Sequence, residues 1–154
     1  MSMKQILSGM DISSSGLTAE RLRMEVAANN IANQRSTRTA QGGPYQRQQV
    51  TFAAAMDQVQ SADGRMPHGG AGVNGLKGVS VVGISSDQTP GDVIHDPGHP
   101  DADATGHVRQ SNVNLSHEMV DLVTASRAYE ANLKSLETFR QMTEQALSLL
   151  RGMR

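Results

Sequence analysis

The C-terminal stretch from Leu115 to Leu150 contains neither glycine nor proline and is rich in helix-forming residues. Its apolar residues recur at steps of three and four, which is the spacing of one face of an α-helix. We therefore predict one long amphipathic helix, capped at its start by Asn114 or Ser116. The predicted seam consists of Leu115, Met119, Leu122, Ser126, Tyr129, Leu133 and Leu136. At about 1.5 Å per residue this helix is roughly 50–55 Å long, so its apolar face needs a partner of similar length.

A second apolar line lies near the N-terminus. An unbroken seven-residue spacing connects Met3, Met10, Leu17, Met24 and Ile31. This pattern predicts an amphipathic helix from about Met3 to about Ala32. Gly9 and Gly16 lie within it, and each is expected to weaken the helix by about 1 kcal/mol relative to alanine. Two interpretations stay open, because the two apolar faces either pack only on each other in a plain helical hairpin or also bind neighbouring chains.

The region between the helices carries short strand signals and many turn residues. Residues 45–52 and 79–85 are typical of strands, and residues 92–95 of a short one. Residues 57–78 are glycine-rich and weakly hydrophobic, which predicts a mobile loop.

These elements predict a mainly α protein with a small β-element. The N-terminal helix occupies residues 1–35, a loop and hairpin-like β insert occupies residues 36–113, and the C-terminal helix occupies residues 114–154. We expect residues 1–35 and 114–154 to pack together as an α-helical coiled coil that forms one domain.

The composition excludes several classes of protein. The chain has 154 residues, enough for one domain, but only 3% are aromatic and none is tryptophan, which does not suit a dense globular core. The formal net charge is −1 without a basic block, so no nucleic-acid interface is expected. The absence of cysteine excludes disulfides, thiol catalysis and cysteine-ligated zinc. No apolar run reaches membrane-spanning length, and the N-terminus lacks the features of a cleaved secretory signal.

The strongest catalytic pattern places His95, His99 and His107 among several aspartates. Imidazole and carboxylate groups are good zinc ligands, so a metal-dependent periplasmic enzyme built on these histidines is one alternative function. However, the spacing matches no metal motif, and aspartate, glycine and proline also serve as turn residues. The turn interpretation is preferred, and we predict no enzyme activity, no catalytic residue, no cofactor and no metal. Glu118 and Asp121 are interpreted as acidic residues that compensate the dipole of the C-terminal helix.

Several longer motifs resemble one known family. The segment VAANNIAN, beginning at Val26, resembles the N-terminal signature of bacterial flagellar rod and hook proteins. The segment EMVDLVTASRAYEAN, beginning at Glu118, is similar to the C-terminal helix of that family. The segments TRT, GGPY and DPGHPDAD, which begin at Thr37, Gly42 and Asp96, resemble the proximal rod subunits in particular.

The resemblance implies a structural subunit of the flagellar basal-body rod, the helical shaft that crosses the periplasm. It implies self-association or assembly into a helical rod through the terminal helices, because a head-to-tail interface that does not close into a ring builds a filament. The implied partners are other rod subunits, proteins of the junction between the MS-ring and the rod, and the flagellar type III export apparatus. Export through that apparatus would need no cleaved signal peptide. Another axial subunit of the rod and hook type is the closest alternative.

The resemblance also adds residues to the expected assembly interface. Asn29, Asn30, Ile31 and Asn33 would shape the exit from the N-terminal helix, where asparagine amides bond loop backbone. Arg127, Tyr129 and Asn132 would lie at the seam between helices or subunits. The whole expected interface is Met3, Met10, Leu17, Met24, Asn29, Asn30, Ile31, Asn33, Met119, Leu122, Arg127, Tyr129, Asn132, Leu133 and Leu136.

Overall fold

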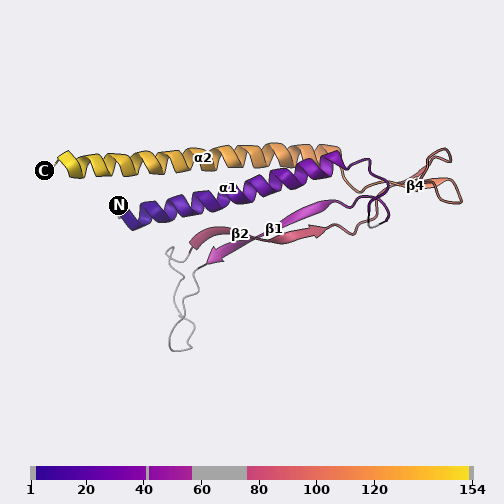
Figure 1. The fold of residues 1–154 in the computed structure, drawn as a ribbon, viewed down its shortest axis with the longest axis horizontal. Helices are drawn as coiled ribbons and strands as arrows, with labels where there is room; N and C mark the ends of the chain where they lie inside the picture. The colour runs from indigo at the N-terminus through magenta and orange to yellow at the C-terminus, as the bar shows by residue number, and fades with distance from the viewer. Residues whose placement is uncertain (1–2, 41, 57–75, 153–154) are drawn as a thin grey trace, which may run out of the picture. The chain divides into compact units, whose positions relative to one another are not determined.

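The computed structural model describes residues 3–40, 42–56 and 76–152, with side chains left undescribed at residues 3–7, 56, 76 and 150–152. Its elements are the helix α1 (Met3–Ala32), the strands β1 (Gln48–Met56), β2 (Leu76–Ser86), β3 (Val93–His95) and β4 (His107–Arg109), and the helix α2 (Leu115–Gly152) (Figure 1). The prediction of a mainly α protein with a small β-element is confirmed. Both helices have the bounds that their apolar periodicity indicates.

The start of α2 is fixed by a side-chain cap. The Oδ1 atom of Asn114 accepts a hydrogen bond of 3.2 Å from the amide of His117. This is the contact that an N-cap residue makes with the third helical position, and it satisfies one of the free amides at a helix start. Of the two predicted caps, Asn114 is therefore correct, while Ser116 lies inside the helix.

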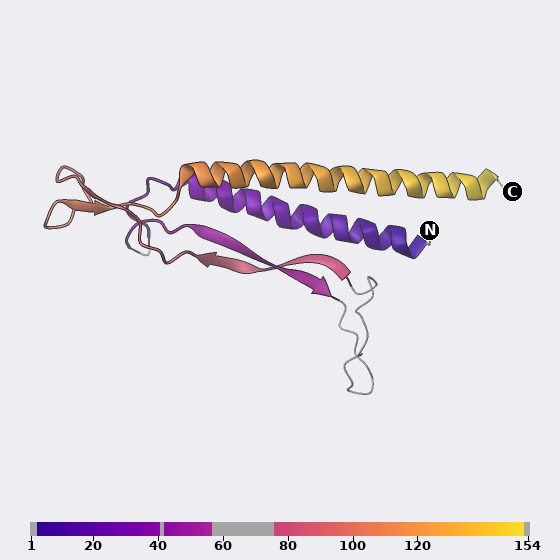
Figure 2. The ribbon, with the colours of Figure 1, turned by 180° about the vertical axis from the view of Figure 1, so that it is seen from behind.

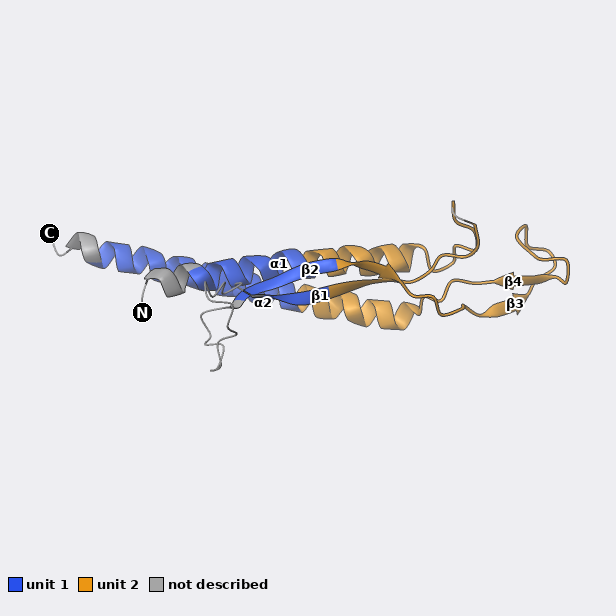
Figure 3. Ribbon diagram, turned by 90° about the horizontal axis from the view of Figure 1, so that it is seen from below, with its two compact units in different colours: residues 1–20, 52–82, 128–154 blue, residues 21–51, 83–127 orange. Residues whose placement is uncertain are grey.

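The chain divides into two compact units, and each contains part of both helices (Figure 3). The first unit consists of residues 1–20, 52–82 and 128–154, and the second of residues 21–51 and 83–127. Within the second unit, the end of α1 lies beside the start of α2 in both views of the ribbon (Figures 1 and 2).

In the first unit, glycines of α1 lie against large side chains of α2. A Cβ atom placed on Gly9 would lie 2.7 Å from the ring of Phe139, and one on Gly16 would lie 2.9 Å from the amide of Asn132. The glycines are one heptad apart in α1 and their neighbours are one heptad apart in α2, in the reverse order. The two segments therefore run antiparallel, and the glycines that the sequence marked as weak points accommodate side chains of α2.

A third close approach in the first unit joins β2 to α1. The amide of Val79 donates a 3.1 Å hydrogen bond to Oγ of Ser15, whose hydroxyl in turn donates to the carbonyl of Ile12 at 2.7 Å. Gly78 has a φ of 97°, which L side chains rarely adopt, and a Cβ atom there would overlap Ser15. The predicted loop over residues 57–78 is wrong at its end, because β2 begins at Leu76, and its remainder lies outside the described residues.

The bounds of β1 differ from the predicted strand 45–52. The amide of Tyr45 bonds to the carbonyl of Ser36, and the amide of Arg47 bonds to the side chain of Asn112. These amides bond to loop and side-chain partners. The strand begins at Gln48. The strand then continues through an alanine run to Met56, where the alternating pattern gave no signal.

The strands form two small sheets. β1 pairs with β2, and β3 pairs with β4 in an antiparallel ladder that places His95 opposite His107. The sequence predicted residues 92–95 as a strand, and β3 confirms it within one residue. It missed β4, because a strand of three residues is too short to show alternation.

The buried apolar side chains of the described residues are small. They are Ala19, Val26, Ala27, Val108, Val113 and Ala125. Most larger apolar side chains of α1 and α2 are half-buried or exposed. In the described part of the chain, neither helix combines the length and hydropathy that crossing a membrane requires.

The tight backbone contact at Gly91 gives the first prediction. A Cβ atom at this position would overlap the carbonyl of Gln110, whose amide donates to the Asp92 carbonyl at 2.8 Å. The obstacle is backbone rather than a mobile side chain, so Gly91→Ala should destabilise this pairing by about 1–3 kcal/mol. The measurement is hydrogen exchange at the Gln110 amide, which should become correspondingly faster.

Gly83→Ala is the matched control, because among the described residues other than its chain neighbours no heavy atom lies within 4 Å of the Cβ position of Gly83. It should leave exchange at Gln110 unchanged. Equal protection of Gln110 in Gly91→Ala and the unaltered protein would contradict the proposed role of Gly91.

Candidate functional site

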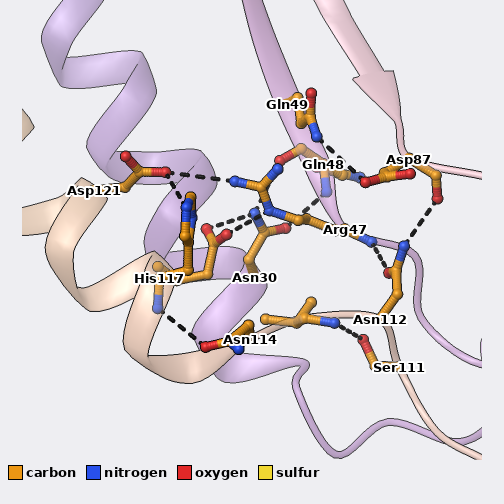
Figure 4. Close-up of polar contacts among 12 residues, drawn as sticks. Asn30, Arg47, Gln48, Gln49, Asp87, Ser111, Asn112, Asn114, His117 and Asp121 are labelled. Carbon is orange, nitrogen blue, oxygen red and sulfur yellow. Dashed lines mark hydrogen bonds and ion pairs between the residues drawn. The ribbon is translucent and has the colours of Figure 1, made fainter. Parts of the chain in front are cut away.

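A polar cluster in the second unit connects the end of α1, the start of α2 and the segment that leads into β1 (Figure 4). We use the name polar cluster for Arg23, Asn30, Tyr45, Arg47, Glu118 and Asp121. Two of its members, Asn30 and Glu118, have the largest side chains that are fully buried among the described residues, and each is 1% exposed. Burying polar groups this completely is unfavourable unless each one finds a partner.

Asn30 forms the centre of the cluster. Its Nδ2 atom donates to Oε2 of Glu118 and to the carbonyl of Gln48, both at 2.9 Å. Its Oδ1 atom accepts from the amide of Gln48 and from the hydroxyl of Tyr45, also at 2.9 Å. An asparagine amide offers two donors and two acceptor sites, so this side chain is fully satisfied. Asn30 thereby ties the last turn of α1 to the first residue of β1.

The buried carboxylate of Glu118 forms an ion pair with Arg47, whose side chain is partly buried. The Nε atom of Arg47 donates to Oε1 of Glu118 at 2.6 Å, and the two side chains are 20% and 2% exposed. Since Asn30 bonds the other carboxylate oxygen, both oxygens of Glu118 are satisfied. Removing one partner of such a pair leaves an uncompensated buried charge, which typically costs about 3–5 kcal/mol. Glu118 therefore fixes Arg47, and the sequence-based assignment of Glu118 to dipole compensation was incomplete.

Asp121 extends the cluster to a second arginine. Its Oδ1 atom accepts from Arg23 at 3.0 Å and its Oδ2 atom from Arg47 at 3.4 Å. His117, Glu118 and Asp121 also offer three ligand atoms within 4.8 Å of one another. However, both carboxylates already face guanidinium groups, whose positive charge would compete with a cation. The arrangement suits a structural joint better than a metal centre.

The backbone of Arg47 is held from the opposite side. Its amide donates to Oδ1 of Asn112 at 2.7 Å, and its carbonyl accepts from the amide of Asp87 at 2.8 Å. The Nδ2 atom of Asn112 donates to the carbonyls of Asp87 and Thr89 at 3.1 and 2.9 Å. One asparagine thus links the segment before β1 to the segment after β2, and orients Arg47 toward α2.

Tyr45 is the titratable member of the cluster with a shifted pKa. Partial burial, and secondarily the negative charge of Glu118, raise the pKa of the Tyr45 phenol above its usual value. Both effects disfavour the phenolate, which also could not donate the hydrogen bond to Asn30.

The structure separates the predicted interface residues by exposure. Asn30 alone is buried, and Met3 lies outside the residues whose side chains are described. The half-buried members are Met10, Leu17, Met24, Ile31, Asn33, Leu122, Tyr129, Asn132 and Leu136. The exposed members are Asn29, Met119, Arg127 and Leu133. Within the cluster only Asn30 belongs to the predicted set, because its partners Arg47 and Glu118 are distant from it in sequence.

The predicted histidine strip is brought together only in part. His95 and His107 face each other across β3 and β4, with ring centroids 4.9 Å apart. His99 instead uses Nδ1 to accept from the backbone amide of Asp101 at 3.1 Å, which is a turn contact. Asp103 accepts from both Thr105 and His107, and these hydrogen bonds hold the pKa of its carboxyl at about 2.

One sequence signal could have indicated the buried glutamate. Glu118, Ala125, Asn132 and Phe139 follow one another at seven-residue intervals. This line contains the most buried positions of α2 in the second unit, whereas the predicted seam followed the larger apolar residues beside it. An acidic residue at the first position of this buried series needs a cationic partner. The sequence alone does not show that Arg47 is that partner.

Asn30→Asp tests the polar cluster with almost no change of shape. The variant loses both amide donors and places a second carboxylate beside Glu118. We expect the free energy of unfolding to fall by at least about 3 kcal/mol, measured by urea unfolding of the helical circular dichroism signal. Asn29→Asp is the control, because Asn29 is exposed and only its side-chain acceptor is used, by Asn33. Similar midpoints for the two variants would contradict a central role for Asn30.

Tyr45 predicts an alkaline loss of stability. Its folded-state pKa is raised, so its contribution is fully present below the unfolded pKa of about 10 and is lost as pH rises through the folded value. The stability difference between the unaltered protein and Tyr45→Phe should therefore shrink above about pH 10. The measurement is urea unfolding of both proteins across this range. A difference that is constant with pH would show that the Tyr45 hydroxyl does not couple to folding.

Comparison with known proteins identifies the family. A family described as "Flagella basal body rod protein" matches residues 10–34, and one described as "Flagellar basal body rod FlgEFG protein C-terminal" matches residues 104–149. These stretches contain Asn30 on one side and Glu118 and Asp121 on the other.

Similarity to curated proteins extends over nearly the whole chain. The flagellar basal-body rod protein FlgC of Borreliella burgdorferi is 41% identical over 154 residues, covering 96% of this chain and 99% of the relative. The FlgC protein of Escherichia coli O157:H7 is 38% identical over 144 residues, covering 94% and 97%. That of Bacillus subtilis is 36% identical over 145 residues, covering 91% and 95%. The chain therefore belongs to the FlgC family of flagellar basal-body rod proteins, which makes it a structural subunit of the flagellum and not an enzyme.

Proposed function

We propose that this chain is a subunit of the proximal part of the rod and assembles helically through its terminal helices into the periplasmic drive shaft. The polar cluster fixes how the chain leaves α1 and enters β1. The apolar faces of the helices supply the lateral contacts. Membership of the FlgC family supports the rod itself, while the position along the rod and the mode of assembly are the proposal.

The observation that carries the proposal is the exposed apolar surface of α2. In the second unit, Met119, Val120 and Val123 are 55%, 65% and 52% exposed. In the first unit, Leu133, Leu147 and Leu149 are 40%, 46% and 71% exposed. Large apolar residues repeated along one helix are typical of protein interaction sites.

The spacing of these residues suits lateral helix packing. Met119, Leu133 and Leu147 follow one another at intervals of two heptads, which is a spacing that a neighbouring helix of similar pitch can match. The methionine is adaptable in shape and suits contact with related but unequal neighbours. This supports the second of the two interpretations of the apolar faces, in which they also bind neighbouring chains.

The proposed assembly domain comprises residues 1–35 and 114–154, paired as a coiled coil, with residues 36–113 as an insert. The glycine contacts at Phe139 and Asn132 support close antiparallel pairing in the first unit. The proposed interface keeps the predicted residues Met3, Met10, Leu17, Met24, Ile31, Met119, Leu122, Tyr129, Leu133 and Leu136, together with Asn29, Asn33, Asn132 and Arg127. Asn30 is buried in the polar cluster and acts from inside the subunit. Exposed members contact neighbouring subunits, and half-buried members contact both the partner helix and a neighbour.

The proposed partners follow from a place at the base of the shaft. They are other rod subunits, proteins at the junction of the MS-ring and the rod, and the flagellar type III export apparatus, which would export the chain without cleavage. Few large apolar residues are buried, which fits export, because a chain with a small core has a small free energy of unfolding.

Leu133→Asp tests the proposed interface. Leu133 is 40% exposed, so a charge at this position should leave the isolated subunit folded. Burying the same charge in a packed interface between subunits is unfavourable. In cells that lack the native gene, we expect this variant to be exported but to give no rods in electron micrographs of basal bodies. Thr138→Asp is the control, because Thr138 is exposed and its hydroxyl bonds only within the helix, to Lys134. Normal rods with Leu133→Asp would remove Leu133 from the interface.

The function itself is tested by deletion and restoration of the chain. Basal bodies from cells without it should lack the rod, hook and filament, and the intact chain should restore all three. Complete rods in the deletion strain would contradict an essential place in the shaft. If the deletion strain forms the proximal part of the rod but not the rest, the chain is a more distal axial subunit.

A further inference from the structure

The β3–β4 hairpin carries a pair of histidines that the assembly proposal does not use. His95 and His107 are directly opposite in the antiparallel ladder. Their ring centroids are 4.9 Å apart, with an angle of 59° between the ring planes. Both residues are exposed, so neither imidazole is needed to fill a core.

A chain of hydrogen bonds sets the tautomer of His107. The hydroxyl of Thr105 donates to Oδ1 of Asp103 at 2.7 Å, and Oγ1 of Thr105 lies 2.9 Å from Nδ1 of His107. Because the only hydroxyl proton of Thr105 is directed to Asp103, Nδ1 of His107 must be the donor to Thr105. In the neutral ring, Nε2 of His107 is then left with a free lone pair. Carboxylate-linked orientation of this kind is typical of histidines that bind metals.

The second unit contains two further histidines, His99 and His117, and both differ from the pair. Nδ1 of His99 accepts the amide of Asp101, so the proton of its neutral ring lies on Nε2 and neither nitrogen is free to bind a cation. His117 lies within 3.7 Å of Asp121, whose carboxylate also faces two arginines. Among the described residues, no hydrogen bond to the ring of His95 is present.

The separation of the two rings fits a shared ion. Zinc binds imidazole nitrogen at about 2.0–2.1 Å in tetrahedral geometry, which places the centres of two ligating rings about 5 Å apart. The observed 4.9 Å has this magnitude before any movement of the side chains. Imidazole pairs favour Zn²⁺, Cu²⁺ and Ni²⁺ over Mg²⁺ and Ca²⁺.

We propose that His95 and His107 form a two-histidine site for a divalent transition-metal ion such as Zn²⁺, with His107 oriented by Thr105 and Asp103. Water fills the remaining coordination positions. The ion bridges β3 and β4 and thereby fixes a hairpin whose ladder has only three residue pairs. The site is structural and is independent of the place of the chain in the rod.

Calorimetric titration of the full chain with ZnCl₂, slightly above neutral pH, tests the site. We expect one ion per chain, with this binding lost in His95→Gln and in His107→Gln. Thr105→Val should lower the affinity by about tenfold or more, because it removes the group that orients His107. His99→Gln and His117→Gln are matched controls and should bind as the unaltered chain does.

Three outcomes of the titration would overturn the proposal. Unchanged affinity in His95→Gln excludes the pair, and loss of binding in His117→Gln assigns the ion to the cluster of His117, Glu118 and Asp121 instead. No binding at all leaves the pair as a cross-strand ring contact only. Should a substitution unfold the hairpin, nitrogen NMR of the unaltered chain decides, because zinc must shift the ring resonances of His95 and His107 and leave those of His99 unchanged.

Discussion

The burial of Glu118 is the constraint on which the second unit depends. A carboxylate that is almost completely removed from water is stable only with a cation and a donor in fixed positions. Arg47 provides the cation and Asn30 the donor, at 2.6 and 2.9 Å. These residues belong to α2, to the segment before β1 and to α1, so one ion pair and one hydrogen bond to the same carboxylate join three parts of the chain (Figure 4).

This dependence on polar contacts follows from the lack of a large apolar core. The buried apolar side chains of the described residues are alanines and valines, so no larger apolar side chain among those residues is buried. Directional hydrogen bonds instead give the unit its specific geometry. Several larger apolar residues remain exposed on α2. In the proposed assembly these residues bind neighbouring subunits, so stability of the isolated chain and capacity for assembly would come from different residues.

Small residues have a related role in the first unit. Gly9 and Gly16 have no side chain, and Phe139 and Asn132 lie so close that a Cβ atom on either glycine would be crowded by them. Gly78 and Ser15 allow an equally close approach of β2 to α1. The intrinsic cost of glycine in a helix is about 1 kcal/mol, and closer packing of the opposing side chains offsets it. The low helix propensity of Gly9 and Gly16 is therefore compatible with α1, because these positions pack closely against side chains of α2.

The two helices and their bounds follow from the local sequence, because apolar periodicity acts over many residues in both and α2 also lacks glycine and proline before its last turn. The sequence also determined the family, through long motifs at both ends. Which residues are buried depends instead on contacts between distant parts of the chain. Asn30, Arg47 and Glu118 are far apart in the chain, and their individual signals are those of a loop amide, a residue of a predicted strand and a helix-dipole partner. Pairing between them depends on distance in space, which no local pattern encodes. For the same reason β4 and the opposition of His95 and His107 emerge only when the hairpin is formed.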